Sequence, residues 1–147
     1  MEKTEKYRLL ERQVAALVEG ETDVIAKMAN VAAVLHETFG FWWTGFYRVA
    51  GDELVLGPFQ GPVACMHIPF GKGVCGTAWK RNETVVVPDV EQFSGHIACS
   101  SASRSEIVVP VHGPDGAVTA VLDIDSDRLA TFDEEDRVWL ERIVELV

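Results

Sequence analysis

Residues 106–125, EIVVPVHGPDGAVTAVLDID, hold two runs of β-branched residues separated by Pro-Asp-Gly, and this stretch decides the fold. Valine and isoleucine favour strands, and Pro-Asp-Gly is typical of a tight turn. The sequence therefore predicts a β-hairpin whose two strands cover residues 106–111 and 117–125. Strands joined by so short a turn are antiparallel.

The second strand of this hairpin carries two carboxylates on one face. Because side chains alternate between the faces of a strand, Leu122 and Ile124 share one face while Asp123 and Asp125 share the other. Carboxylates on so apolar a strand need a cation or a hydrogen-bond donor nearby. They are equally well explained as strand-end aspartates beside a turn, and the sequence leaves both interpretations open.

The remaining elements predict an α+β domain. Apolar residues recur at helical spacing over residues 4–18 and 22–39, and glycines at 20 and 40 end these helices. A further hairpin is expected at 41–50 and 53–59, then a strand at 65–68, a short helix to residue 81 and a strand at 84–87. Thr131 and Glu134 predict a capping box that opens a helix over residues 131–147.

This order indicates one domain over residues 1–147, with N-terminal helices at 4–39, sheet and loops at 41–125 and a C-terminal helix at 131–147. The central sheet is expected to be antiparallel, with the helices mainly on one face. The inward positions of the two N-terminal helices are expected at Leu10, Val14, Leu17 and Val18, and at Val24, Met28, Val31, Leu35 and Phe39.

The strand at 41–50 is rich in aromatic residues. Alternation puts Trp43, Gly45 and Tyr47 on one face and Trp42, Thr44 and Phe46 on the other. Trp43 and Tyr47 would then stand on either side of a gap at Gly45, an arrangement that suits the wall of a pocket. Tryptophans that simply fill the core would give the same pattern.

Three glycines, Gly71, Gly73 and Gly76, spell G-x-G-x-x-G between a predicted strand and a predicted helix, with Glu91 further on. This is the form of a dinucleotide-binding motif. The helix is too short for the usual crossover and the surrounding hairpins indicate an antiparallel sheet, so we reject a nucleotide cofactor. The glycines are better explained as a tight strand-to-helix turn.

Composition excludes several classes of function. The net charge is −10 and the 13 basic residues are dispersed, which argues against nucleic acid as a partner. The charged start lacks the apolar segment of a secretory signal, and no apolar run approaches the length of a membrane span, so we expect a cytoplasmic protein without membrane contact. Three cysteines argue against a permanent disulfide framework.

Cys99 lies in a long loop, residues 88–104, among small and polar residues that cannot pack a core. A thiol there is readily oxidised, so we expect Cys99 to have a function. Zinc ligands are available at Cys65, His67, Cys75, His96 and Cys99, but no C-x-x-C pair is present and we expect no metal. A hydrolase with Cys99 as nucleophile and His96 as base lacks a third group and an evident oxyanion hole.

Redox chemistry uses more of the sequence. A thiolate that takes oxygen from a substrate becomes a sulfenic acid, and a second cysteine can condense with it to give a disulfide. The oxygen must leave as water, which a protonated carboxyl would assist, and a ligand ammonium would need a carboxylate. Glu106, Asp123 and Asp125 could divide these roles.

Several motifs closely resemble the free methionine-(R)-sulfoxide reductases, which are single GAF domains. They are GPVAC (61–65), GKGVCG (71–76), Asp89-Val90 followed by FSGHIAC (93–99), SEIVVP (105–110), LDIDS (122–126) and FDEED (132–136). The likeness runs from about Trp42 to the final helix. Three cysteines in these contexts are far more specific than a general GAF pattern.

The resemblance implies an enzyme that reduces free L-methionine (R)-S-oxide, with no cofactor and with thioredoxin as reductant. Cys99 would be the nucleophile, Cys65 the main resolving thiol and Cys75 a second partner in disulfide exchange. The pocket would be formed by Glu106, Asp123 and Asp125, which act on the sulfoxide oxygen and the amino group, and by Trp43 and Tyr47, which surround the methyl group and backbone end.

One position departs from the family pattern, which often has aspartate after the nucleophilic cysteine where this chain has Ser100. The change removes a negative charge beside the thiolate and so alters the tuning of its pKa. The alternative function is a non-enzymatic GAF sensor that binds a small ligand, since GAF folds host many roles. A homodimer through the first helix is a further expectation.

Overall fold

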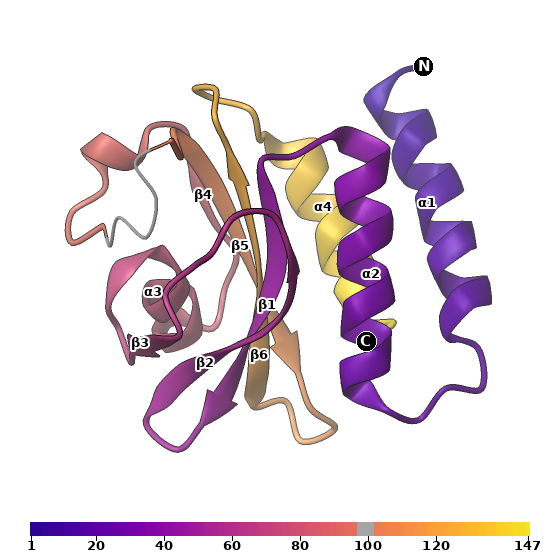
Figure 1. Ribbon diagram of the computed structural model, residues 1–147, viewed down its shortest axis with the longest axis horizontal. Helices are drawn as coiled ribbons and strands as arrows, with labels where there is room; N and C mark the ends of the chain where they lie inside the picture. Colours follow the sequence, from indigo (N-terminus) through magenta and orange to yellow (C-terminus); the bar gives the residue numbers. More distant parts are fainter. Residues whose placement is uncertain (97–101) are drawn as a thin grey trace.

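In the computed structural model, which describes residues 1–96 and 102–147, an antiparallel sheet forms the centre of the molecule (Figure 1). Its strands are β1 (Trp43–Ala50), β2 (Glu53–Gln60), β3 (His67–Pro69), β4 (Val85–Val87), β5 (Ser105–His112) and β6 (Val118–Ser126). The described strands lie in the order β3-β2-β1-β6-β5-β4, and every neighbouring pair is antiparallel. The predicted sheet type and both predicted hairpins are therefore confirmed.

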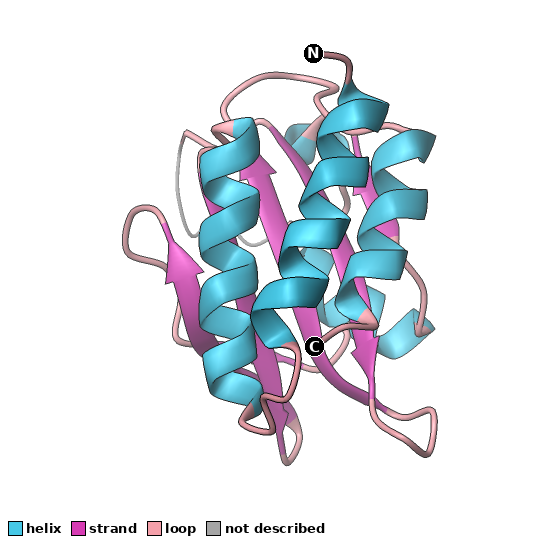
Figure 2. Cartoon of the chain, turned by 90° about the vertical axis from the view of Figure 1, so that its right-hand side faces the viewer, coloured by secondary structure: helices cyan, strands magenta, loops and turns pink. Residues whose placement is uncertain are grey.

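The helices are α1 (Lys3–Val18), α2 (Val24–Phe39), α3 (Gly73–Arg81) and α4 (Glu134–Val144), with a short 3₁₀ turn η1 (Val90–Gln92). Figures 1 and 2 show α1, α2 and α4 together on one face of the sheet, while α3 lies on the other. Helices mainly on one face were predicted. None of the helices among the described residues is long and apolar enough to cross a membrane.

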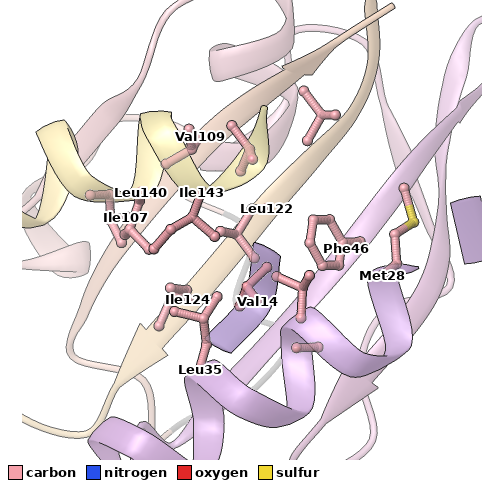
Figure 3. Close-up of a cluster of buried hydrophobic side chains, with 14 of the residues drawn as sticks. Val14, Met28, Leu35, Phe46, Ile107, Val109, Leu122, Ile124, Leu140 and Ile143 are labelled. Atoms are coloured by element: carbon pink, nitrogen blue, oxygen red, sulfur yellow. The ribbon is translucent and has the colours of Figure 1, made fainter. Parts of the chain in front are cut away.

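The main core lies between the sheet and the three helices on its covered face (Figure 3). Strands contribute Phe46, Ile107, Leu122 and Ile124, which are fully buried. Leu122 and Ile124 share the inward face of β6 as predicted, since side chains on one face recur every second residue. A second, smaller cluster around α3 covers part of the opposite face.

A buried hydrogen-bond network joins α1 to α4. The Tyr7 hydroxyl donates to Asp136 Oδ1 at 2.5 Å, and Lys3 Nζ lies 2.8 Å from Asp136 Oδ2. Asp136 is 1% exposed, so these partners replace the water that its carboxylate loses. The network holds the first helix against the last.

Some predicted boundaries are wrong. The cap of α4 is Asp133, which forms a capping box with Asp136, rather than Thr131 with Glu134. Thr131 instead donates its hydroxyl to Ser126 Oγ at 2.6 Å, a bond to the end of β6 that local sequence does not reveal. The strand predicted at 65–68 lies at His67–Pro69, and the last helix ends at Val144.

Two expected inward positions, Leu17 and Val24, are also wrong. They are 46% and 45% exposed. Both lie within the last or first turn of their helix, where the chain leads into the α1–α2 connection.

The glycine-rich stretch forms the predicted strand-to-helix turn. Gly71 and Gly73 have positive φ angles of 74° and 62°, which favour glycine. At Gly76 a Cβ atom would lie 2.6 Å from the carbonyl oxygen of Pro69, so only glycine lets α3 approach β3 this closely. The turn places Cys75 in the first turn of α3.

Candidate active site

A cavity lies on the face of the sheet that carries α3. The residues that line it come from β1 and the residue before it, from β5 and β6, from β3 and the segment before it, from α3 and from the loop after η1. They are Trp42, Trp43, Tyr47, Val63, Ala64, Ile68, Gly73, Val74, Cys75, His96, Ser103, Glu106, Asp123 and Asp125. The lining combines aromatic and apolar side chains with three carboxyl groups and a thiol.

Strand register brings the polar residues together. Across β1, β6 and β5, Trp43 pairs with Asp125, which in turn pairs with Glu106. One row further, Gly45 pairs with Asp123. The two aspartates of β6 therefore share the cavity face, as alternation predicted, and the hairpin register adds Glu106 beside them.

The aromatic wall differs in part from the prediction. Trp43 and Tyr47 share the cavity face and stack with ring centroids 5.9 Å apart. There is no gap at Gly45, because the Trp43 ring lies across it: Trp43 Cη2 is 2.7 Å from the point where a Cβ atom would be. Trp42 lines the cavity instead of lying on the face of Thr44, because β1 begins only at Trp43 and alternation does not extend back to it.

Both rings of the wall also hold the segment that precedes β3. Trp43 Nε1 donates to the carbonyl oxygen of Pro62 at 3.0 Å, and the Tyr47 hydroxyl donates to that of Cys65 at 2.9 Å. Burial and the neighbouring carboxylates raise the pKa of Tyr47, so its hydroxyl stays a donor. These two bonds fix the backbone on both sides of Ala64, which lines the cavity.

The carboxyl cluster is held out of water. Glu106 and Asp123 are 5% and 6% exposed. Burial, and then the charges of neighbouring carboxylates, raise the pKa of Glu106 and of Asp125 well above the ordinary range. Burial also raises the pKa of Asp123, but hydrogen bonding from Glu106 and Cys75 opposes the rise. Asp123 is therefore the carboxyl of the cluster that ionises most readily.

One oxygen of this cluster stands out. Asp123 Oδ1 is buried and has no hydrogen-bond partner among the described residues. Asp125 Oδ1, by contrast, accepts from the Ser103 hydroxyl at 3.0 Å. A buried carboxylate oxygen without a donor is costly unless a cation or donor completes it.

The structure describes two of the three cysteines, and these two differ in their bonding. Cys75 is free and 4% exposed, and burial together with nearby carboxylates raises the pKa of its thiol. Cys65 is disulfide-bonded. Cys99 and Ser100 lie outside the described residues, between His96 and Ser103, both of which line the cavity.

Among the residues that the structure describes, the candidate zinc ligands taken from the sequence are not brought together as a set. His67 is remote and pairs with Glu53 at 2.9 Å, while Cys75 and His96 both line the cavity. The residues whose ligand atoms do gather are Cys75, Glu106 and Asp123. Burial lowers the pKa of His96, whose Nε2 lies 3.8 Å from Glu106 Oε1. Sequence reasoning missed Ser103 as a cavity residue, since a lone loop serine carries no pattern.

Comparison with known proteins shows which family this chain resembles. The sequence profile of the GAF domain matches residues 19–147. Free methionine-R-sulfoxide reductase of Escherichia coli K12 is 48% identical over 145 residues, which cover 98% of this chain and 87% of the relative. Its namesake in Saccharomyces cerevisiae is 41% identical over 139 residues, covering 89% and 77%.

Solved structures agree. The X-ray structure of free methionine-R-sulfoxide reductase from Neisseria meningitidis, in complex with its substrate, has a TM-score of 0.97 to this chain. The two are 53% identical, and the match covers 99% of this chain and 88% of that one. Sequence and fold lead to the same assignment: this chain belongs to the free methionine-R-sulfoxide reductases, a family of GAF domains.

Proposed function

We propose that this chain reduces free L-methionine (R)-S-oxide to L-methionine at the cavity described above. The observation that carries the proposal is the unpartnered Asp123 Oδ1 beside two carboxyls whose pKa values are raised by burial, in a cavity that is also lined by aromatic rings. A free amino acid sulfoxide presents an ammonium, a polar S–O group and a methyl group. The cavity offers a matching group for each.

The ammonium is assigned to Asp123. Its buried oxygen lacks a donor among the described residues, and an ammonium supplies both the donor and the positive charge. Burial raises the pKa values of Glu106 and Asp125 and so favours their protonated forms, and both are assigned to donate to the sulfoxide oxygen. Trp43 and Tyr47 face the methyl end.

Cys99 is assigned as the nucleophile. It is three residues from His96 and four from Ser103, and both of these flanking residues line the cavity. Its thiolate attacks the sulfoxide sulfur, the oxygen passes to the cysteine as a sulfenic acid, and methionine is released. The Cys65 thiol then condenses with the sulfenic acid, which forms a disulfide and expels the oxygen as water.

A dithiol reductant returns both cysteines to thiols, and thioredoxin is the proposed partner. Cys65 adjoins Ala64 on the cavity wall and already enters a disulfide, which supports its role as the resolving thiol. Cys75 is buried with a raised pKa, so disulfide exchange through it is the slower route. A homodimer and a cytoplasmic location remain predictions.

The test is a turnover assay with the separated sulfoxide epimers, in which methionine is quantified with a thioredoxin system as reductant. We expect turnover of the free R epimer, little of the S epimer or of peptide-bound sulfoxide, and loss of activity in Cys99→Ser. Equal turnover of both epimers, or activity that survives Cys99→Ser, would contradict the proposal. Binding of the R epimer without turnover would favour the sensor.

A further inference from the structure

The buried group of Cys75, Glu106 and Asp123 has a composition that ammonium binding does not explain. One ligand atom from each residue lies within 4.8 Å of the other two, and all three residues are buried. Carboxylate oxygens suffice for an ammonium, whereas a thiol sulfur is a weak acceptor that adds little to it. Sulfur beside two carboxylates is instead a donor set for a metal ion.

A second observation points to a cation at the same place. Asp123 lines the cavity, and its Oδ1 is buried and has no hydrogen-bond partner among the described residues. A positive ion there would complete the coordination of this oxygen. We propose that Cys75, Glu106 and Asp123 form a binding site for a divalent cation of borderline softness, and that Zn²⁺ is the ion that the site fits.

The chemistry of the donors selects the ion. Zn²⁺ binds thiolate sulfur at about 2.3 Å and carboxylate oxygen at about 2.0–2.2 Å, so tetrahedral ligand atoms lie about 3.3–3.8 Å apart. The three atoms here would need to close by about 1 Å, which side-chain rotation can supply. Mg²⁺ and Ca²⁺ prefer oxygen ligands and do not use sulfur, so they fit less well.

A fourth ligand is available nearby. His96 lines the same cavity, and its Nε2 lies 3.8 Å from Glu106 Oε1. An imidazole nitrogen is a common zinc ligand, and water is the alternative for this position. The His96 side chain is 17% exposed, so it faces the cavity rather than solvent.

Binding exchanges protons for the ion and involves no redox change. The thiol proton of Cys75 and the carboxyl proton of Glu106 pass to solvent as one zinc–sulfur and two zinc–oxygen bonds form, the second oxygen coming from the carboxylate of Asp123. The ion binds Asp123 Oδ1, the oxygen assigned above to the substrate ammonium. Zinc and substrate would therefore exclude each other, so the site makes the enzyme sensitive to free zinc.

The test is a metal titration of the reduced, metal-free full chain without substrate, so its outcome does not depend on the proposed reaction. Zn²⁺ binding is measured by calorimetry, and Co²⁺ serves as a spectroscopic probe of sulfur ligation. We expect one ion per chain and a thiolate-to-cobalt charge-transfer band. Loss of a residue that only hydrogen-bonds to a metal ligand typically lowers metal affinity by about 10–100-fold. Cys75→Ser removes a ligand itself, so it should weaken zinc binding by at least about 100-fold.

The matched control is Cys65→Ser, which removes a thiol that does not belong to the group and should leave affinity unchanged. Asp123→Asn, which keeps the size of the side chain, should weaken binding as Cys75→Ser does, and circular dichroism checks that both variants fold. Absence of binding would overturn the proposal. So would affinity that is lost in Cys65→Ser and kept in Cys75→Ser, because the ion would then be held by other thiols.

Discussion

The hydroxyl of Tyr47 offers a way to separate the two stages of the proposed reaction. It donates to the carbonyl oxygen of Cys65 at 2.9 Å, and the ring itself is 2% exposed in the cavity wall. Tyr47→Phe keeps the ring and removes only the donor. The change should therefore act on the segment that carries Cys65 and leave the apolar wall in place.

The size of the effect follows from the bond. A hydrogen bond of this kind contributes about 0.5–1.5 kcal/mol net, equivalent to a 2- to 10-fold change in the population of the bonded segment. Part of the loss is recovered when water reaches the partly buried carbonyl of Cys65. Trp43 still holds the segment at Pro62, so the segment should loosen without detaching. We expect disulfide formation to slow by about 2- to 10-fold.

The assay is a single turnover with reduced enzyme and no reductant, in which released methionine and lost thiols are followed separately. Methionine release should keep its wild-type rate, while the loss of thiols in pairs slows. Tyr7→Phe is the matched control, because Tyr7 is a buried tyrosine that does not line the cavity and should change neither rate. If methionine release slows as much as thiol loss, the hydroxyl acts on substrate and the reasoning fails.

Three further predictions concern stability. Tyr7→Phe leaves Asp136 Oδ1 without its donor, and should lower the free energy of unfolding in urea by about 1.5–3 kcal/mol; an unchanged midpoint would refute this. Gly76→Ala places a Cβ atom 2.6 Å from the Pro69 carbonyl oxygen, and should cost about 1–3 kcal/mol by the same measurement, whereas no loss would mean that the turn yields freely. The raised pKa of Glu106 means that the folded state holds a proton that the unfolded chain gives up near its ordinary value of 4.5, so stability should fall as pH rises from there through the raised pKa. In Glu106→Gln that fall should be smaller. The check is the free energy of unfolding in urea at several pH values for both proteins, and an equal dependence on pH would contradict the assignment.

The sequence predicts residues that share a strand face, because side-chain alternation is set by backbone geometry alone. Asp123 with Asp125, and Trp43 with Tyr47, were placed correctly for this reason. Glu106 was named through chemistry and family likeness, whereas its place beside Asp125 depends on the register of the hairpin. Register is set by pairing between strands, which no single strand contains.

Features that depend on tertiary contacts escaped prediction. Thr131 and Asp133 are both good helix caps, and the choice between them follows from the bond that Thr131 makes to Ser126. Trp42 escaped because alternation applies only inside a strand, and the strand begins one residue later. The grouping of Cys75, Glu106 and Asp123 escaped for a related reason: its members lie on three separate elements, and no spacing along the sequence reveals such a group.

The two faces of the sheet have different roles: one packs the core that stabilises the fold, and the other carries the groups of the cavity. On β6 the even-numbered residues, such as Leu122 and Ile124, pack against α1, α2 and α4, while Asp123 and Asp125 face the cavity. Burying carboxyls and an unpartnered oxygen on the second face opposes folding, so the apolar face must offset that cost. Since both sets alternate along the same strand, a one-residue slip in register would bury the aspartates in the core and expose the leucine and isoleucine. The same apolar packing that stabilises the fold therefore also holds the reactive groups in their positions.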